Sequence, residues 1–259
     1  MTIFLIFFIA HWYLSLFCQT FFLHRYAAHS MFTMSKGWEK FFYILTWLTQ
    51  GSSYLSPYAY GILHRLHHAF TDTEEDPHSP SYTKGLFPLM WKTKIIYNDI
   101  ENYRLKVDEK FMKNLPMWRS FDHFASSRLS RLGWVAIYIV IYAFIATQWW
   151  MWLLLPITIL TGPVHGAIIN YFAHKYGYRN FDTPDTSKNF LPIDLIMMGE
   201  SYHNNHHKLL ARPNFGIKWF EIDPTYPVIR LLSALKVIRL NQEPQPLSLI
   251  HISEPTRPY

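Results

Sequence analysis

The 259-residue sequence contains a single cysteine and few charged residues. Because Cys18 is alone, the chain can form neither a disulfide framework nor a cysteine-based metal site. Charged residues make up 16% of the chain, well below the roughly 25% of an ordinary soluble domain. Half of the residues are hydrophobic and are concentrated in runs. This composition indicates an integral membrane protein.

Basic residues are absent from two long stretches. Residues 1–23 and 132–170 carry no Lys or Arg, although the chain has 24 of these residues and a formal net charge of +6. Retention of basic residues on the cytoplasmic side of a membrane produces such an asymmetry. We therefore expect membrane lipids as neighbours and no nucleic-acid partner.

The apolar runs predict the membrane helices. Residues 2–23 have about the length needed to cross a hydrocarbon core of roughly 30 Å. Residues 134–147 and 149–172 are separated by one residue and predict a transmembrane hairpin. The run at 41–55 is shorter and contains a Gly-Ser-Ser break. We expect it to form an embedded or interfacial helix.

The predicted fold is all-α: about three to four transmembrane helices, preferably three, and a cytosolic helical cap that carries a histidine-rich di-metal site. The cap comprises 71–131 and the residues after 174, including an amphipathic, interfacial stretch at 226–240. Residues 1–246 are expected to form one domain. Residues 247–259 (LSLIHISEPTRPY) resemble a translated sequencing adapter, and His251 within them is expected to carry no function.

Four polar motifs follow or interrupt these runs, and they hold nine of the fourteen histidines. They are HRYAAH (His24, His29), HRLHH (His64, His67, His68), NYFAH (Asn170, His174) and HNNHH (His203, His206, His207). Positions i, i+3 and i+4 of a helix share a face, so each HxxHH motif is expected to present three imidazoles to one point. His24 and His29 are about 140° apart on an α-helix, so we expect that helix to end between them.

These motifs predict a metal centre, because neutral imidazole is a common ligand of iron, copper and zinc. Nine histidines exceed the three or four ligands of a single zinc ion and fit two ions. The carboxylates expected to orient ligand imidazoles, or else to cap helices or face water, are Asp72, Asp76, Asp194 and Glu200. Four histidines are not assigned to the site: His11 and His165 as intramembrane residues, and His78 and His123 as solvated loop residues. The Glu75/His78 and Glu200/His203 pairs are interpreted as coincidental.

The combination of His-x4-His and two His-x2-His-His boxes resembles the membrane fatty acid desaturases, most closely bacterial acyl-CoA desaturases of the delta-9 type. The resemblance runs from about residue 10 to residue 240 and includes HRLHHAFTDTEEDPHSP and GESYHNNHHKLLARPNFG. It implies that the nine histidines bind two iron ions, and that Asn170 reaches one of them through water. One predicted span precedes the first box, where animal relatives have two. The third box begins with His203 instead of glutamine, which favours the delta-9-like branch.

The resemblance also implies the reaction. O2 and two electrons remove two hydrogens from adjacent methylenes of a fatty acyl-CoA or acyl-lipid, leaving a cis double bond. No His-Pro-Gly-Gly haem motif is present, so electrons are expected from a separate donor, such as ferredoxin or a b-type cytochrome with its reductase. The expected location is the bacterial inner membrane, with the active site on the cytoplasmic side.

Three other functions fit parts of the pattern. A membrane di-iron hydroxylase of alkanes, fatty acids or sterols would use a similar metal site but add oxygen to its product. A zinc-dependent intramembrane hydrolase would hold a single zinc ion. A metal transporter or haem-binding protein would place its ligands near the bilayer midplane, whereas the motifs here lie at the ends of the runs.

Overall fold

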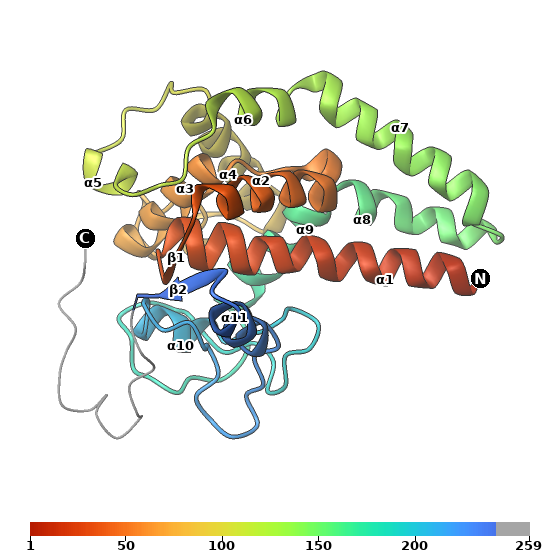
Figure 1. Ribbon diagram of the computed structural model, residues 1–259. Coiled ribbons are helices and arrows are strands. Elements are labelled where there is room, and N and C mark those ends of the chain that lie inside the picture. The colour runs from red at the N-terminus through yellow and green to blue at the C-terminus, as the bar shows by residue number, and fades with distance from the viewer. Residues whose placement is uncertain (242–259) are drawn as a thin grey trace.

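The computed structural model describes residues 1–241, and this part of the chain is mainly helical (Figure 1). The predicted all-α class is confirmed, with one short sheet added. The first elements are α1 (Thr2–Phe17), the π-helix η1 (Cys18–Ala28), β1 (Phe32–Met34), α2 (Lys36–Gln50), η2 (Gly51–Ser53), α3 (Pro57–Phe70), η3 (Pro80–Tyr82) and α4 (Leu86–Glu101). The remaining elements are α5 (Glu109–Met112), α6 (Arg119–Ala125), α7 (Arg128–Ile145), η4 (Trp149–Leu154), α8 (Leu155–Ile159), α9 (Thr161–Ala167), η5 (Ile168–Phe172), α10 (His203–Lys208), α11 (Thr225–Ala234) and β2 (Ile238–Leu240). Residues 247–259, for which an adapter origin was predicted, lie outside the described residues.

Within residues 1–241, two helices are long and apolar enough to cross a membrane, and a bent pair raises the number to three. The two helices are Thr2–Ala28, which joins α1 to η1, and α7. In Figure 1 both helices extend away from the end of the molecule where the shorter elements lie, toward the end that holds the N-terminus. α2 has 15 residues, fewer than the roughly 20 that a crossing requires, so it adds no full span.

The second arm of the predicted hairpin is not one straight helix. Trp149–Ile159 and Thr161–Phe172 meet at an angle of 76°. Pro163 has no N–H to donate to the carbonyl of Ile159, which breaks the helical ladder at this point. Two serines of η2 replace the missing partners: the Ser52 hydroxyl donates to the Ile159 carbonyl at 2.7 Å, and Ser53 Oγ accepts from the Gly162 N–H at 3.0 Å. The bend is therefore built into the packing, and it directs the chain toward His174.

The amphipathic stretch predicted at 226–240 is helical only in its first part. α11 ends at Ala234, and β2 then pairs antiparallel with β1, with Phe32 opposite Leu240. Lys236 lies between α11 and β2 and has a φ of 59°, a left-handed conformation that cannot continue a right-handed helix. The pairing fastens the C-terminal part of the described chain to the residues that directly follow His29.

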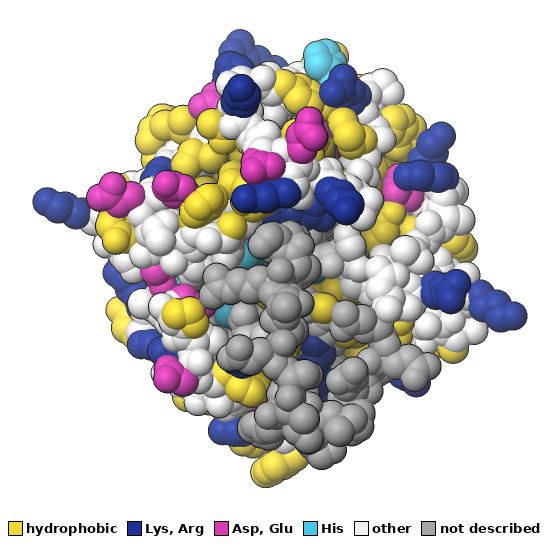
Figure 2. All heavy atoms as spheres, turned by 90° about the vertical axis from the view of Figure 1, so that its left-hand side faces the viewer, with side chains coloured by type: hydrophobic (Ala, Val, Ile, Leu, Met, Phe, Trp, Pro, Cys, Tyr) yellow, Lys and Arg dark blue, Asp and Glu magenta, His cyan; other side chains and the backbone are white. Residues whose placement is uncertain are grey.

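An aromatic core surrounds η1 and holds it in place. Phe21, Phe22 and Phe42 are fully or almost fully buried there, and the ring centroids of Phe21 and Phe42 are 4.9 Å apart. Figure 2 shows the opposite end of the molecule from the α1 N-terminus, with many Lys and Arg side chains around its rim. The basic residues therefore gather at the cap end, as the charge pattern predicts.

Candidate metal centre

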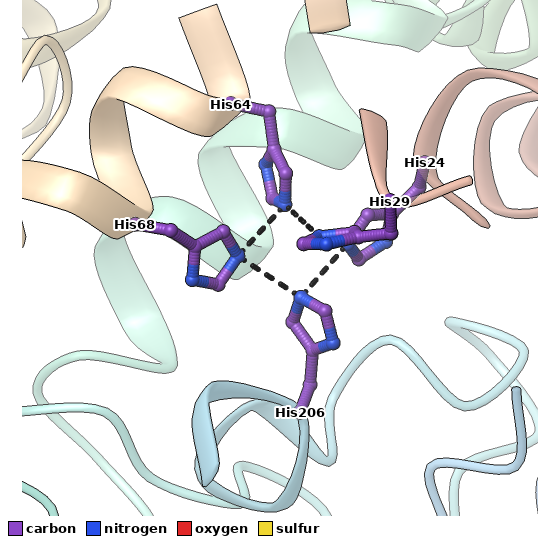
Figure 3. A group of neighbouring side chains, drawn as sticks. All are labelled: His24, His29, His64, His68 and His206. Carbon is purple, nitrogen blue, oxygen red and sulfur yellow. Dashed lines mark hydrogen bonds between the residues drawn. The ribbon is translucent and has the colours of Figure 1, made fainter. Parts of the chain in front are cut away.

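The nine histidines of the sequence motifs gather in two groups at the cap end of the helices. The first group contains His24, His29, His64, His68 and His206, and Figure 3 shows their rings turned toward one another. The second group contains His67, His174, His203 and His207. Within each group, one candidate ligand atom from every residue lies within 4.8 Å of the others. The motifs thus converge from four separate parts of the chain.

The spacing of the ring nitrogens fits a metal ion. In the first group, Nε2 of His64 lies 2.8 Å from Nε2 of His29 and 2.9 Å from Nε2 of His68. In the second, the Nε2 atoms of His174 and His203 are 3.0 Å apart. Two nitrogens at right angles on an ion, each at about 2.1 Å, are separated by about 3 Å. Both groups therefore have the separations of neighbouring ligands around one ion.

Each HxxHH motif contributes to both groups, so the expectation that its three imidazoles meet at one point is wrong. His64 and His68 belong to the first group and His67 to the second; in the other motif His206 belongs to the first group. Residues i and i+4 are about 40° apart around a helix, whereas i+3 and i+4 are about 100° apart. The i, i+4 pair therefore converges on one point, and the i+3 residue turns toward the other.

The helix ends between His24 and His29, as the spacing predicts, and its last turn is π-helical. η1 is a π-helix, and the N–H of His29 donates to the His24 carbonyl at 3.1 Å, an i to i+5 bond. Residues five apart are then one turn apart and lie on the same side. The ring centroids of the two histidines are 5.0 Å apart. The predicted helix end is confirmed, since η1 ends at Ala28, and the π-helical form of the last turn is an addition to the prediction.

Carboxylates orient several of the rings. Glu200 accepts from His24 Nδ1 at 2.6 Å, and both oxygens of Asp76 lie 3.0 Å from His67 Nδ1. His207 Nδ1 lies 3.1 Å from Asp185. Because a carboxylate accepts the Nδ1 proton, each Nε2 is left with a lone pair that faces its group. Lone pairs that converge in this way are suited to hold a cation between them.

The predicted set of orienting carboxylates was partly right. Glu200 and Asp76 bond imidazoles, and Asp72 lies 3.9 Å from His174 Nδ1, which also contacts Thr186. Asp194 contacts no imidazole and instead accepts the N–H groups of Met197, Gly199 and Ser201. Asp185 was missed because it lies 22 residues before His207, in a loop without a recognisable motif.

Glu200 is the centre of a buried network. Besides His24, it accepts from Thr20 and from Arg25, whose nitrogen lies 3.2 Å away. Arg25 is fully buried and also pairs with Asp223 at 2.7 Å. Burial raises the pKa of Glu200, but His24 and Arg25 outweigh burial and hold it below its usual value. Glu200 is therefore ionised, and the network joins the first box to residues near the third.

His78 was expected to be solvated, but it is buried. The residue is 2% exposed, and its ring centroid lies 4.2 Å from that of His67. The other unassigned histidines belong to neither group. His11 bonds the Tyr138 hydroxyl at 2.8 Å, His165 is buried against Trp12, and His123 is exposed. His251 lies outside the described residues.

A cavity of about 50 Å³ adjoins both groups. Its lining includes His24 and His64 of the first group, His203 of the second, and Asn170. One water needs about 10–15 Å³ of such space, so the cavity holds a few water-sized molecules. Asn170 is therefore placed beside the centre, at a cavity wall instead of among the converging imidazoles.

Burial sets the protonation of the imidazoles. It lowers the pKa of His64, His68, His203 and His206 well below 6.5, and that of His174 to about 3. In the unfolded chain these groups would titrate near 6.5. The folded protein thus keeps them neutral near pH 7, which is the form that binds metals.

The metal-free protein should therefore lose stability as the pH falls below about 6.5. Between that pH and the lowered folded pKa values, the unfolded state binds more protons, so each buried histidine contributes up to about 1.4 kcal/mol of destabilisation per pH unit. Thermal unfolding of the purified, metal-free protein in detergent at pH 7.5 and 5.5 checks this. The exposed-site variant His123→Ala should show the same pH dependence as wild type, and an unfolding temperature independent of pH in this window would contradict the prediction.

Comparison with known proteins decides the family. The sequence model described as fatty acid desaturase matches residues 1–242. The chain belongs to the fatty acid desaturase family. This desaturase is similar to the Delta-9 desaturase-like 2 protein of Arabidopsis thaliana, with 31% identity over 223 residues, 84% of this chain and 70% of the relative. It is also similar to the sn-1 stearoyl-lipid 9-desaturase of Anabaena variabilis, with 26% identity over 215 residues, 82% of this chain and 74% of that protein.

A third similar protein carries the name of a different desaturase. The acyl-CoA 5-desaturase AL21 of Anemone leveillei is 31% identical over 218 residues, 82% of this chain and 63% of that protein. The predicted resemblance is confirmed, and the desaturase is an oxidoreductase that acts on fatty acyl chains in a lipid environment. Its histidine groups are suited to metal, and hydroxylase, hydrolase and transporter functions are not favoured.

Proposed function

We propose that this desaturase uses two iron ions and O2 to introduce a cis double bond into a saturated fatty acyl chain. The observation that carries the proposal is the division of nine buried or half-buried imidazoles into groups of five and four around two separate points. Imidazole suits iron, and iron, unlike zinc, can carry the electron transfer. The proposed ligands are His24, His29, His64, His68 and His206 for one ion and His67, His174, His203 and His207 for the other.

Bound iron would supply the redox step: with O2, two electrons and two protons, it would remove one hydrogen from each of two adjacent methylenes, leaving a double bond and releasing two waters. The chain's own residues hold the centre. Glu200, Asp76 and Asp185 keep their imidazoles in the tautomer that presents Nε2. Asn170, on the cavity wall, is proposed to act on one ion through a water molecule.

The proposed orientation places the centre on the cytoplasmic side of a bacterial inner membrane. The histidine groups lie at the same end of the spans as the basic residues, and basic residues concentrate on the cytoplasmic side. A separate donor, ferredoxin or a b-type cytochrome with its reductase, would supply the electrons there. The basic rim also suits an acyl carrier that bears phosphate, whether coenzyme A or a lipid headgroup.

Expression in a host without unsaturated fatty acids tests the proposal. We expect a new fatty acid that is two hydrogens lighter than its saturated precursor, and two iron ions per purified chain. Mass spectrometry of fatty acids from separated acyl-CoA and lipid fractions would also identify the carrier. A product that gains oxygen would indicate hydroxylation, and one zinc ion per chain without iron would indicate a hydrolase; either result would exclude the proposal.

A further inference from the structure

His78 lies beside the second histidine group, in a loop fixed by Asp76. The Asp76 carboxylate accepts the His78 N–H at 2.9 Å and contacts His67 Nδ1 at 3.0 Å. It also accepts the N–H of Asp72 at 2.9 Å. One carboxylate thus fixes both the ring of a proposed ligand and the backbone of the residue whose ring lies against it.

The ring of His78 is polar, buried and unpaired. Among the described residues, neither of its nitrogens has a hydrogen-bond partner. A neutral imidazole has one donor and one acceptor, and leaving a buried polar group without a partner costs about 1–3 kcal/mol.

The cavity offers this ring a partner. His78 lines the same space of about 50 Å³ as Asn170, His24, His64 and His203. His24 and His64 turn their Nε2 atoms toward the first group, at 3.0 Å from His206 and 2.8 Å from His29 respectively. The ring nitrogens of His78 have no such partner among the described residues, so they are available to bond a small polar molecule in the cavity.

The position argues against a ligand role for His78. His78, His67 and Asp76 do lie close enough together for a metal. However, the Asp76 oxygens are occupied by two backbone N–H groups and by His67 Nδ1, while His67 Nε2 faces His207 at 3.3 Å. An ion held by His67 Nδ1 and Asp76 would have to displace the hydrogen bond between them.

We propose that His78 is a positioning residue that donates a hydrogen bond from its ring to a water molecule in the cavity it shares with Asn170. The inference rests on the proposed function, in which that water links Asn170 to an ion. A fixed imidazole donor holds the water in one orientation beside the second group. Removing the donor should leave the metals bound but change their surroundings and slow the reaction.

Variants at His78 test this with and without a hydrogen-bonding side chain. His78→Phe keeps an aromatic ring without a donor, His78→Gln keeps a donor, and His123→Phe is the matched control at an exposed histidine. Each purified protein is loaded with iron for metal analysis and activity, and separately with Co²⁺ for its absorption spectrum. We expect His78→Phe to retain the wild-type metal content, to shift the Co²⁺ bands and to lose about tenfold or more in turnover, with partial recovery in His78→Gln.

Two outcomes would overturn the inference. Loss of an ion from both His78 variants would make His78 a ligand, and a His78→Phe protein with wild-type spectrum and turnover would make it a packing residue. If His78→Phe does not fold, His78→Leu takes its place against His78→Gln with the same expectations. Wild-type protein that binds neither iron nor Co²⁺ would defeat the proposed function itself, and this control separates the two failures.

Discussion

Replacing His67 by alanine should abolish the unsaturated product and remove about one of the two metal ions. His67 is fully buried, and its Nε2 faces His207 at 3.3 Å in the four-histidine group. Because that group has only four imidazoles, the substitution removes a quarter of its protein ligands. It also leaves Asp76, an ionised and fully buried carboxylate, without its imidazole. We expect a loss in product of at least about a hundredfold, since the second ion is lost and not merely displaced.

The measurement is fatty acid profiling in a host that lacks unsaturated fatty acids, together with metal analysis of the purified variant. His123→Ala, at an exposed histidine of α6, is the matched control and should behave as wild type. The membrane fraction should contain equal amounts of all three proteins. A His67→Ala enzyme that still carried two ions per chain and formed product would show that His67 is no ligand.

Replacing Glu200 by alanine should have the second large effect. It should both release the His24 ring from its fixed orientation and destabilise the folded protein. Glu200 accepts from His24 and Arg25, which are both almost entirely buried. Without this carboxylate, His24 loses the partner that fixes its tautomer, and Asp223 is the one ionic partner that Arg25 keeps among the described residues. Breaking a buried ion pair costs about 3–5 kcal/mol, and loss of an orienting carboxylate lowers metal affinity roughly 10–100-fold. We therefore expect a lower unfolding temperature and weaker metal binding in the first group.

Thermal unfolding in detergent and competition with a metal chelator measure the two effects. Glu75→Ala is the control, because Glu75 also precedes a histidine by three residues but is exposed. Glu200→Gln keeps the shape of the side chain and should lie between alanine and wild type in stability. If the Glu200→Ala protein had the metal affinity and unfolding temperature of wild type, Glu200 would neither orient His24 nor stabilise the centre.

The histidine spacing predicted which residues would meet, but not how they would be divided. HRLHH and HNNHH require only helical geometry to bring three rings near a common face. Their division between two groups depends on where the other helices stand, and that is tertiary information. The approach of His24 to His29 depends on a π-helix, which differs from an α-helix by hydrogen bonds that side-chain periodicity does not reveal. The span count and helical class, by contrast, follow directly from run length.

Residues outside the motifs were harder to predict. His78 follows Pro77 in a polar loop, so local composition favoured a solvated side chain, whereas packing against His67 buries it. Asp185 reaches His207 only because the loop folds back over α10. The bend at Leu160 did have a signal, because Gly162 and Pro163 lie inside the apolar run. That signal was outweighed by the continuity of hydrophobic residues.

The sharing of α3 and α10 between the two histidine groups has a thermodynamic consequence. A ligand that fixes His64 and His68 on α3 also restricts the rotation of the same helix, and therefore the position of His67. The same holds for His206 and its neighbours on α10. An ion bound by either group orders part of the helix that the other group also uses, which lowers the entropy cost of the second binding step. By thermodynamic reciprocity, each ion raises the affinity for the other by the same factor. Two ions bound at these points would therefore each favour the binding of the other, without making either strictly dependent on the other.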